Sequence, residues 1–142
     1  MTPVVVDTNV LVAGLLTADP GAPTLAIVNA MVSGQLRHLL SEALLAEYRQ
    51  VLLRPKIAAR HGLSEENVDA LLVEIVAGGA MRSPPPTSSR APDPGDQHLF
   101  ELLLETDDAL LITGDRLLLR AGRAHTLRIR TPAEFRTAWS RW

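Results

Sequence analysis

The chain contains no cysteine among its 142 residues, which excludes a disulfide scaffold, a thiolate metal site and a cysteine nucleophile. It also lacks a long hydrophobic run. The longest uncharged stretch, residues 20–36, includes two prolines and two glycines and would make a poor membrane span. Asp7 interrupts the earliest apolar run and the first basic residue is Arg37, so we expect no secretory signal. These absences favour a cytoplasmic protein without a membrane segment.

Neither sign of charge dominates the chain. Its 14 basic and 16 acidic residues give a net charge of −2, which excludes a polycation that binds nucleic acid by bulk charge. With 46% hydrophobic and 21% charged residues, the chain can bury a core and is unlike a disordered tail. The length is that of one ordinary domain and no internal repeat is present, so we expect residues 1–142 to form a single domain.

Short apolar runs alternate with stretches of helical periodicity. The clearest helical stripe has apolar residues at 68, 71, 72, 75 and 76, behind the N-cap candidate Ser64. Residues 83–94 contain five prolines, which predicts an extended loop. The expected strands are 3–6, 37–40, 109–113 and 127–130, and the expected helices are 10–16, 24–32, 42–53, 65–78, 94–105, 116–121 and one that begins at 132. Such strand spacing is too long for hairpins and predicts an α/β fold with a parallel sheet.

Acidic residues stand just beyond two of the expected strands. Asp7 follows the first strand directly, and Asp115 follows the strand 109–113 across one glycine. Ligands of open parallel sheets bind outside the carboxyl ends of the strands, which makes both residues candidates for a site. Asp93 and Asp96 begin the helix that leads into the second of these strands, and Asp96 shares a helix face with apolar residues.

Each of these acids also has a purely structural explanation. Asp7, Asp93 and Asp115 precede expected helices and could act only as N-caps. Asp96 could simply interact with the positive end of a helix dipole, although its position on the core-facing side argues against a solvated role. From the individual residues alone, the structural and the functional explanations both stay open.

A further acid comes from the helix 42–53, where Glu42 and Glu47 both flank the apolar stripe and periodicity does not choose between them. Three or four carboxylates at one sheet edge, with no lysine nearby in sequence, would raise one another's pKa values. A divalent ion relieves that repulsion, and ligands that are all oxygen favour Mg²⁺ or Mn²⁺ over zinc. Such an ion activates a water and neutralises charge on a phosphodiester, which suits phosphodiester hydrolysis.

Five stretches follow one another along the chain: VVVDTNVL at 4–11, LSEALLAEY at 40–48, DPGD at 93–96, LITGDRLL at 111–118 and TPAEF at 131–135. In this order they resemble the motifs of a PIN domain, and the similarity extends over residues 3–135. Each motif alone is weak, whereas the ordered set is specific. Within the family, the sequence is most similar to the VapC-like toxins of bacterial toxin–antitoxin pairs.

The resemblance implies a three-layer α/β/α sandwich around a central parallel sheet, and a divalent-metal-dependent endoribonuclease activity with Mg²⁺ or Mn²⁺. It selects Glu47 rather than Glu42. These toxins are usually homodimers silenced by a cognate antitoxin protein, so RNA, an antitoxin and a second copy are the implied partners. The implied catalytic and metal-binding residues are Asp7, Glu47, Asp96 and Asp115, with Asn9, Asp93 and Thr113 as auxiliary residues.

Positive charge is concentrated near the end of the sequence, where residues 116–142 contain seven arginines and one glutamate. A basic segment beside an acidic pocket suits an enzyme that holds RNA phosphates with arginine. The candidate RNA-binding residues are Arg116, Arg120 and Arg123. The alternative is a solvated surface in a chain whose basic residues are nearly all arginine.

Two other functions stay open. One is a catalytically inactive PIN-like module that binds RNA or protein. The other is a phosphatase with Asp7 as the nucleophile, which would need a second acid where Asn9 stands. Residues without a motif receive no catalytic role: we expect the two tryptophans to dock the C-terminal helix and assign nothing to the histidines. These residues are Trp139, Trp142, His38, His61, His98 and His125.

Overall fold

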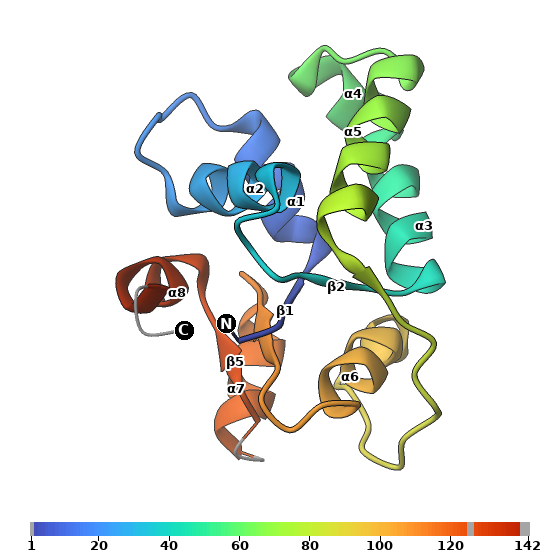
Figure 1. The fold of residues 1–142 in the computed structure, drawn as a ribbon, viewed down its shortest axis with the longest axis vertical. Helices are drawn as coiled ribbons and strands as arrows, with labels where there is room; N and C mark the ends of the chain where they lie inside the picture. Colours follow the sequence, from blue (N-terminus) through green and yellow to red (C-terminus); the bar gives the residue numbers. More distant parts are fainter. Residues whose placement is uncertain (1, 125–126, 140–142) are drawn as a thin grey trace.

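The computed structural model describes residues 2–124 and 127–139. Parallel strands form the centre of the fold (Figure 1). Strand β4 (Leu110–Ile112) lies between β1 (Val4–Val6) and β5 (Ile129–Arg130), and β2 (Leu39–Leu40) pairs with β3 (Ala80–Met81). A single bridge between Val4 and His38 joins the two groups, which gives the order β3-β2-β1-β4-β5.

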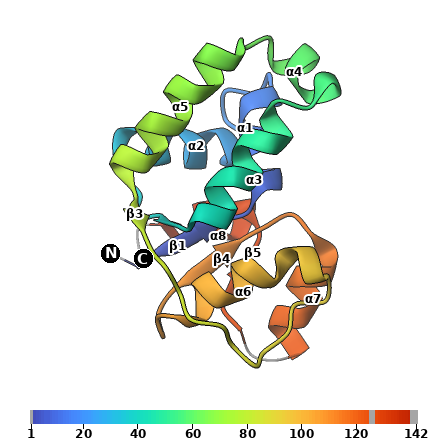
Figure 2. The same ribbon diagram turned by 90° about the vertical axis from the view of Figure 1, so that its right-hand side faces the viewer.

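Helices cover both faces of this sheet (Figure 2). Helix α6 packs against β1 and β4, and α7 against β5, whereas α1, α2, α3 and α5 pack with one another on the other side. This is the α/β/α sandwich that the sequence predicts. The helices are α1 (Thr8–Leu16), α2 (Pro23–Ser33), α3 (Glu42–Leu52), α4 (Pro55–His61), α5 (Glu65–Gly78), α6 (Gln97–Leu104), α7 (Arg116–Ala124) and α8 (Pro132–Ala138), with a 3-10 turn η1 (Pro94–Asp96) before α6.

Burial explains why the short strands form where they do. Every residue of β1 and β4 is fully buried, as continuous β-branched and aliphatic runs in a covered parallel sheet must be. Close backbone approach also shapes the helical layer, because a Cβ on Gly14 would lie 2.5 Å from a Val28 side-chain carbon. Glycine at this position therefore lets α1 and α2 pack tightly.

The structure differs from the sequence expectations in three elements. Strand β3 and helix α4 were not expected, because β3 has only two residues and α4 is a seven-residue helix of mostly basic and small residues. The expected end of α7 before Gly122 is wrong, since the helix continues to Ala124. A Cβ on Gly122 would lie 2.9 Å from the Ile129 Cβ, so this glycine serves close packing on β5 rather than helix termination.

Several local expectations are confirmed. Thr131 and Glu134 form a complete capping box at the start of α8. The proline-rich segment 83–94 is extended up to η1, which takes in its last residue, and it is tied to α6 through the Gln97 side chain, which bonds to the backbone of Ser89 and Ala91 at 2.9 Å each. No helix within the described ranges is long and apolar enough to cross a membrane.

At the end of α8, the Trp139 ring packs 5.3 Å from the Phe135 ring, between centroids, in agreement with a docked helix. The Arg136 guanidinium lies over the same Trp139 ring, 5.6 Å from the ring centroid. Trp142 and His125 lie outside the described residues.

Candidate active site

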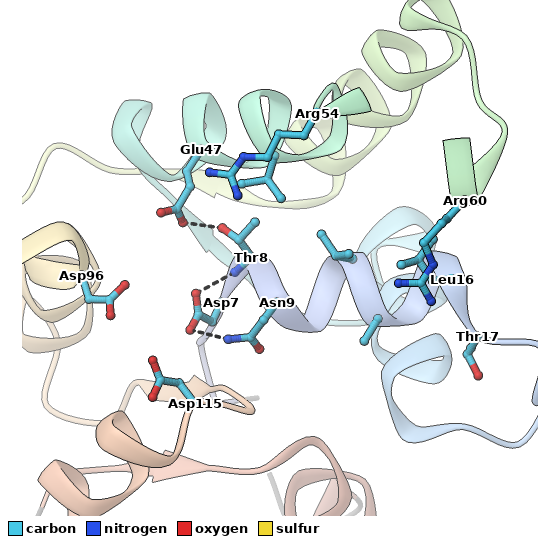
Figure 3. Close-up of a pocket in the computed structure, with 13 residues that line it drawn as sticks. Asp7, Thr8, Asn9, Leu16, Thr17, Glu47, Arg54, Arg60, Asp96 and Asp115 are labelled. Carbon is cyan, nitrogen blue, oxygen red and sulfur yellow. Dashed lines mark hydrogen bonds between the residues drawn. The ribbon is translucent and has the colours of Figure 1, made fainter. Parts of the chain in front are cut away.

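A groove of about 660 Å³ opens where β1 and β4 end and α1 begins (Figure 3). Four acidic side chains from separate segments of the chain point into its near end. They are Asp7, Glu47, Asp96 and Asp115. The other lining residues are Thr8, Asn9, Val12, Ala13, Leu16, Thr17, Val51, Arg54 and Arg60.

Asp7 lies at the centre of this acidic end because β1 stops at Val6 and α1 starts at Thr8. One carboxylate oxygen accepts a hydrogen bond from the Thr8 backbone N–H at 2.8 Å, which is the N-cap interaction. The other accepts from the Thr113 hydroxyl at 2.8 Å and from the Asn9 amide at 3.0 Å. The capping and site explanations are thus compatible, since one oxygen caps the helix while the group faces the groove.

Thr113 links the ends of the two central strands. Its fully buried hydroxyl donates to Asp7 and accepts from the Asp115 backbone N–H at 3.0 Å. Asn9 completes the link, because its carbonyl oxygen accepts from the Gly114 N–H at 3.0 Å. Asp115 itself caps α7 through a 2.8 Å bond from the Leu117 N–H. Two of the three auxiliary residues predicted from the sequence, Asn9 and Thr113, therefore hold Asp7 and the Asp115 segment together.

The position of Glu47 follows from the packing of α3. The neighbouring Tyr48 is fully buried and its hydroxyl donates to the Val6 carbonyl, which fixes α3 against the end of β1. Glu47 then reaches the groove, where it accepts a hydrogen bond from the Thr8 hydroxyl. Glu42, which periodicity could not distinguish, instead lines an apolar groove between α3 and α5.

Asp96 enters the site from the turn η1, opposite α3. Within the part of the chain that the structure describes, its carboxylate receives no hydrogen bond. Asp93 is exposed and its carboxylate caps the same turn, with a 2.8 Å bond from the Gly95 N–H, so its influence on the site is one of charge. The segment thus supplies one unpartnered acid to the groove.

His98, to which the sequence analysis assigns no role, lies beside the site. Its Nε2 lies 3.7 Å from a Glu47 carboxylate oxygen. Its Nδ1 is buried and has no hydrogen-bond partner among the described residues. This contact joins α6 to α3, so the sequence of α6 alone does not reveal it.

Burial and the neighbouring carboxylates raise the pKa values of two of the four acids, Asp7 and Asp96. Burial raises the pKa of Asp7, against the lowering effect of its bonds from Thr113 and Thr8, and the charges of Glu47 and Asp115 raise it further. Burial followed by the charges of Asp7, Asp115, Asp93 and Glu47 raises the pKa of Asp96 to about 6. The site therefore concentrates negative charge at a free-energy cost that a cation would relieve.

The donor set fits a hard divalent cation in its chemistry, since it consists of carboxylate oxygens with hydroxyl and amide support. Across residues 2–124 and 127–139, however, no three carboxylate or imidazole side chains are close enough together to form a metal-binding group. The acids surround a common space rather than closing on one point (Figure 3).

Sequence reasoning missed the basic residues of the groove. Arg54 and Arg60 line it, whereas Arg116, Arg120 and Arg123 are exposed on α7 and are not among its lining residues. A signal existed in the sequence, because residues 54–61 contain two arginines, a lysine and a histidine. Their relation to the acids depends on α4, which the sequence analysis did not identify.

A parallel sheet between helical layers, with acids gathered near the carboxyl ends of its strands, agrees with the PIN-domain resemblance of the sequence. A sequence model of the PIN domain family matches residues 3–117, and the chain belongs to this family. No curated protein matches the sequence. PIN domains are generally nuclease folds, so the family supports a hydrolase acting on nucleic acid.

Proposed function

We propose that this protein is a divalent-metal-dependent endoribonuclease that hydrolyses RNA phosphodiester bonds at the acidic end of the groove. The observation that carries the proposal is the convergence of four acids from β1, α3, η1 and β4 on one space. Among the described residues, only His98 lies within ion-pair distance of any of them. Uncompensated carboxylates of this kind suit a cation better than they suit a stable apo protein.

Asp7, Glu47, Asp96 and Asp115 would hold Mg²⁺ or Mn²⁺. When bound, such an ion lowers the pKa of a water and offsets the charge that develops on a phosphodiester. The chain supplies the orientation of the ligands: Thr8 fixes the Glu47 carboxylate, and Thr113 and Asn9 fix that of Asp7.

The phosphatase alternative receives no support from the site. It requires an acid two residues after the nucleophile Asp7, and Asn9 occupies that position. Both ends of the Asn9 amide are engaged, one with Asp7 and the other with the Gly114 backbone. An amide held in this way cannot donate or accept a proton for a leaving group.

Cleavage of RNA by the purified protein tests the proposal directly. We expect hydrolysis in Mg²⁺ or Mn²⁺, none in EDTA, and a loss of at least about 100-fold in Asp115→Asn, because removal of a ligand exceeds the usual effect of removing a supporting residue. Asp108→Asn is the matched control, since Asp108 is an exposed acid near β4 outside the groove lining. Intact RNA with the wild-type protein would leave the inactive binding module as the better explanation.

The resemblance to VapC-like toxins extends the proposal to a biological role, that of the toxin in a toxin–antitoxin pair. In this role the protein would act in the cytoplasm as a homodimer, and a cognate antitoxin would cover the groove. Arg116, Arg120 and Arg123 would contact RNA outside the groove, because α7 begins directly after Asp115. Induced expression should then arrest growth, Asp115→Asn should relieve the arrest, and growth at the normal rate with active enzyme would exclude the toxin role.

A further inference from the structure

The groove continues beyond the acids along the length of α1. Its floor there is apolar and consists of Val12, Ala13 and Leu16. Arg54 and Arg60 form part of the wall, with Arg60 near Leu16 and Thr17 at the far end (Figure 3). From Thr8 to Leu16 the helix rises by on the order of 12 Å. The groove is therefore longer than the acidic site that opens at one end of it.

The backbone around the two arginines is firmly held. The Arg54 carbonyl accepts from the Ile57 and Ala58 N–H groups at 2.9 and 2.8 Å, so Arg54 caps α4 through its backbone alone. At the other end of α4, the His61 Nε2 lies 2.8 Å from the Leu52 carbonyl and its Nδ1 accepts from the Leu63 N–H. The side chains of Arg54 and Arg60 are therefore not required for the fold of this region.

Neither guanidinium is used elsewhere in the described structure. Arg49 pairs with Glu65 and Asp69, and Arg82 pairs with Glu105, but neither Arg54 nor Arg60 forms an ion pair or side-chain hydrogen bond with any described residue. Both line the groove that the acids also line. Two unpaired guanidiniums beside an apolar floor suit a ligand that carries both negatively charged groups and flat apolar rings.

We propose that the groove along α1 binds single-stranded RNA, with Arg54 and Arg60 holding phosphates on one side of the cleavage point and bases resting on Val12, Ala13 and Leu16. The proposal rests on the endoribonuclease function and adds the place where the strand is held, with Arg54 and Arg60 as two further substrate-binding residues. A duplex turns its bases toward the partner strand, so it cannot lay them on this floor, whereas a single strand can. Both arginines are binding residues: Arg60 lies at the end of the groove away from the acids, whereas the Arg54 guanidinium lies nearer to Glu47 and Thr8 in the view of Figure 3.

Fluorescence anisotropy of a short labelled single-stranded RNA in EDTA tests this without cleavage. We expect Arg54→Ala and Arg60→Ala each to weaken binding about tenfold at about 50 mM salt, and to lower the slope of log K against log salt by about 0.7. Lys56→Ala is the control, because it removes an exposed positive charge from the same helix outside the groove lining. It should change binding less than twofold, and the same RNA annealed to its complement should bind at least tenfold more weakly.

Equal effects of Lys56→Ala and the two arginine variants, or equal binding of single strand and duplex, would overturn the proposal. Arg54→Lys and Arg60→Lys should recover part of the affinity, since they keep the charge and lose the planar fork. Unchanged thermal unfolding separates lost contacts from lost fold. If RNA is cleaved but its binding does not depend on Arg54 and Arg60, only this inference fails. If binding depends on both arginines but RNA stays intact, only the endoribonuclease proposal fails.

Discussion

The two ends of the groove differ in how their charged side chains are held. At the acidic end, Asp7 is only 5% exposed and hydrogen bonds from Thr8, Asn9 and Thr113 fix its carboxylate. Along the rest of the groove, the side chains of Arg54 and Arg60 make no such bonds with the described residues. Chemistry at a phosphodiester needs fixed oxygens, whereas attraction of a flexible strand needs charge within reach. In the proposed function, catalysis would therefore take place among the fixed acids and binding would depend on the two arginines.

The acids and the arginines of the groove also differ in their effect on the stability of the folded protein. The acids repel one another and burial raises the pKa values of Asp7 and Asp96, so the acidic end stores unfavourable free energy in the metal-free protein. The arginines are exposed and solvated, and their removal should cost little stability. Substitutions at the two ends should therefore differ in the sign of their effects on stability as well as in their effects on activity.

The largest expected effect is a difference in kcat between substitutions of two glutamates on the same helix, Glu47 and Glu42. Glu47→Gln keeps an oxygen for the Thr8 hydroxyl but removes the charge, so we expect kcat to fall at least about 100-fold. Glu42→Gln lies on the same helix but outside this groove, so its activity should be unchanged and its unfolding free energy should stay within about 0.5 kcal/mol. Steady-state RNA cleavage measures both, and equal kcat values in the two variants would contradict the placement of Glu47.

An intermediate effect should come from Thr113, which supports Asp7 from β4. Thr113→Val removes a hydrogen bond that lowers the Asp7 pKa, so that pKa rises further. If Asp7 acts ionised, the acidic limb of the pH–rate profile moves to higher pH and the rate falls about tenfold near pH 6.

A matched threonine provides the control for this variant. The Thr106 hydroxyl is buried and has no hydrogen-bond partner within the described residues, so Thr106→Val should leave the pH–rate profile unchanged and stability equal or higher. An unshifted acidic limb in Thr113→Val would show that Asp7 does not need the Thr113 bond.

The smallest effect should be a gain in stability at Asp96. Its pKa is raised from 3.8 to about 6, so the folded state binds the proton more tightly and its contribution to stability is lost as the pH rises through that window. Asp96→Asn removes the penalty and should raise the unfolding free energy by about 1 kcal/mol at neutral pH in EDTA, after allowance for solvent screening.

The pH dependence of this gain distinguishes its cause. Well below pH 3.8 the Asp96 carboxyl is neutral in both the folded and the unfolded state, so the advantage of Asp96→Asn should disappear there and should already be much smaller at about pH 4 than at neutral pH. Denaturant unfolding at about pH 4 and pH 7.5 measures the difference. A variant that is less stable than wild type at neutral pH would contradict the stored repulsion.

Much of the fold could be predicted from the sequence because its signals are local. The buried runs of β1 and β4, the apolar stripe of α5 and the capping box of α8 each depend on residues close in sequence. Strand β3 could not be recognised in this way, since it is defined by its pairing with Leu39 and Leu40. Gly122 misled the prediction because its packing partner, Ile129, lies beyond the helix.

The site residues also differ in whether local sequence signals could predict them. Strand ends located Asp7 and Asp115, and the motif order selected Glu47, whereas periodicity alone could not. The groove arginines were missed because their place beside the acids depends on how α4 packs near α1. Contacts between distant segments are also what brings His98 to Glu47.

Calorimetric titration of the metal-free protein with Mn²⁺ tests most directly whether the acidic end is a cation site. The account predicts saturable binding to the wild-type protein at neutral pH, loss of that heat in Asp96→Asn and Asp115→Asn, and its retention in Glu42→Gln. Absence of binding to the wild-type protein, or equal binding to all four proteins, would contradict it.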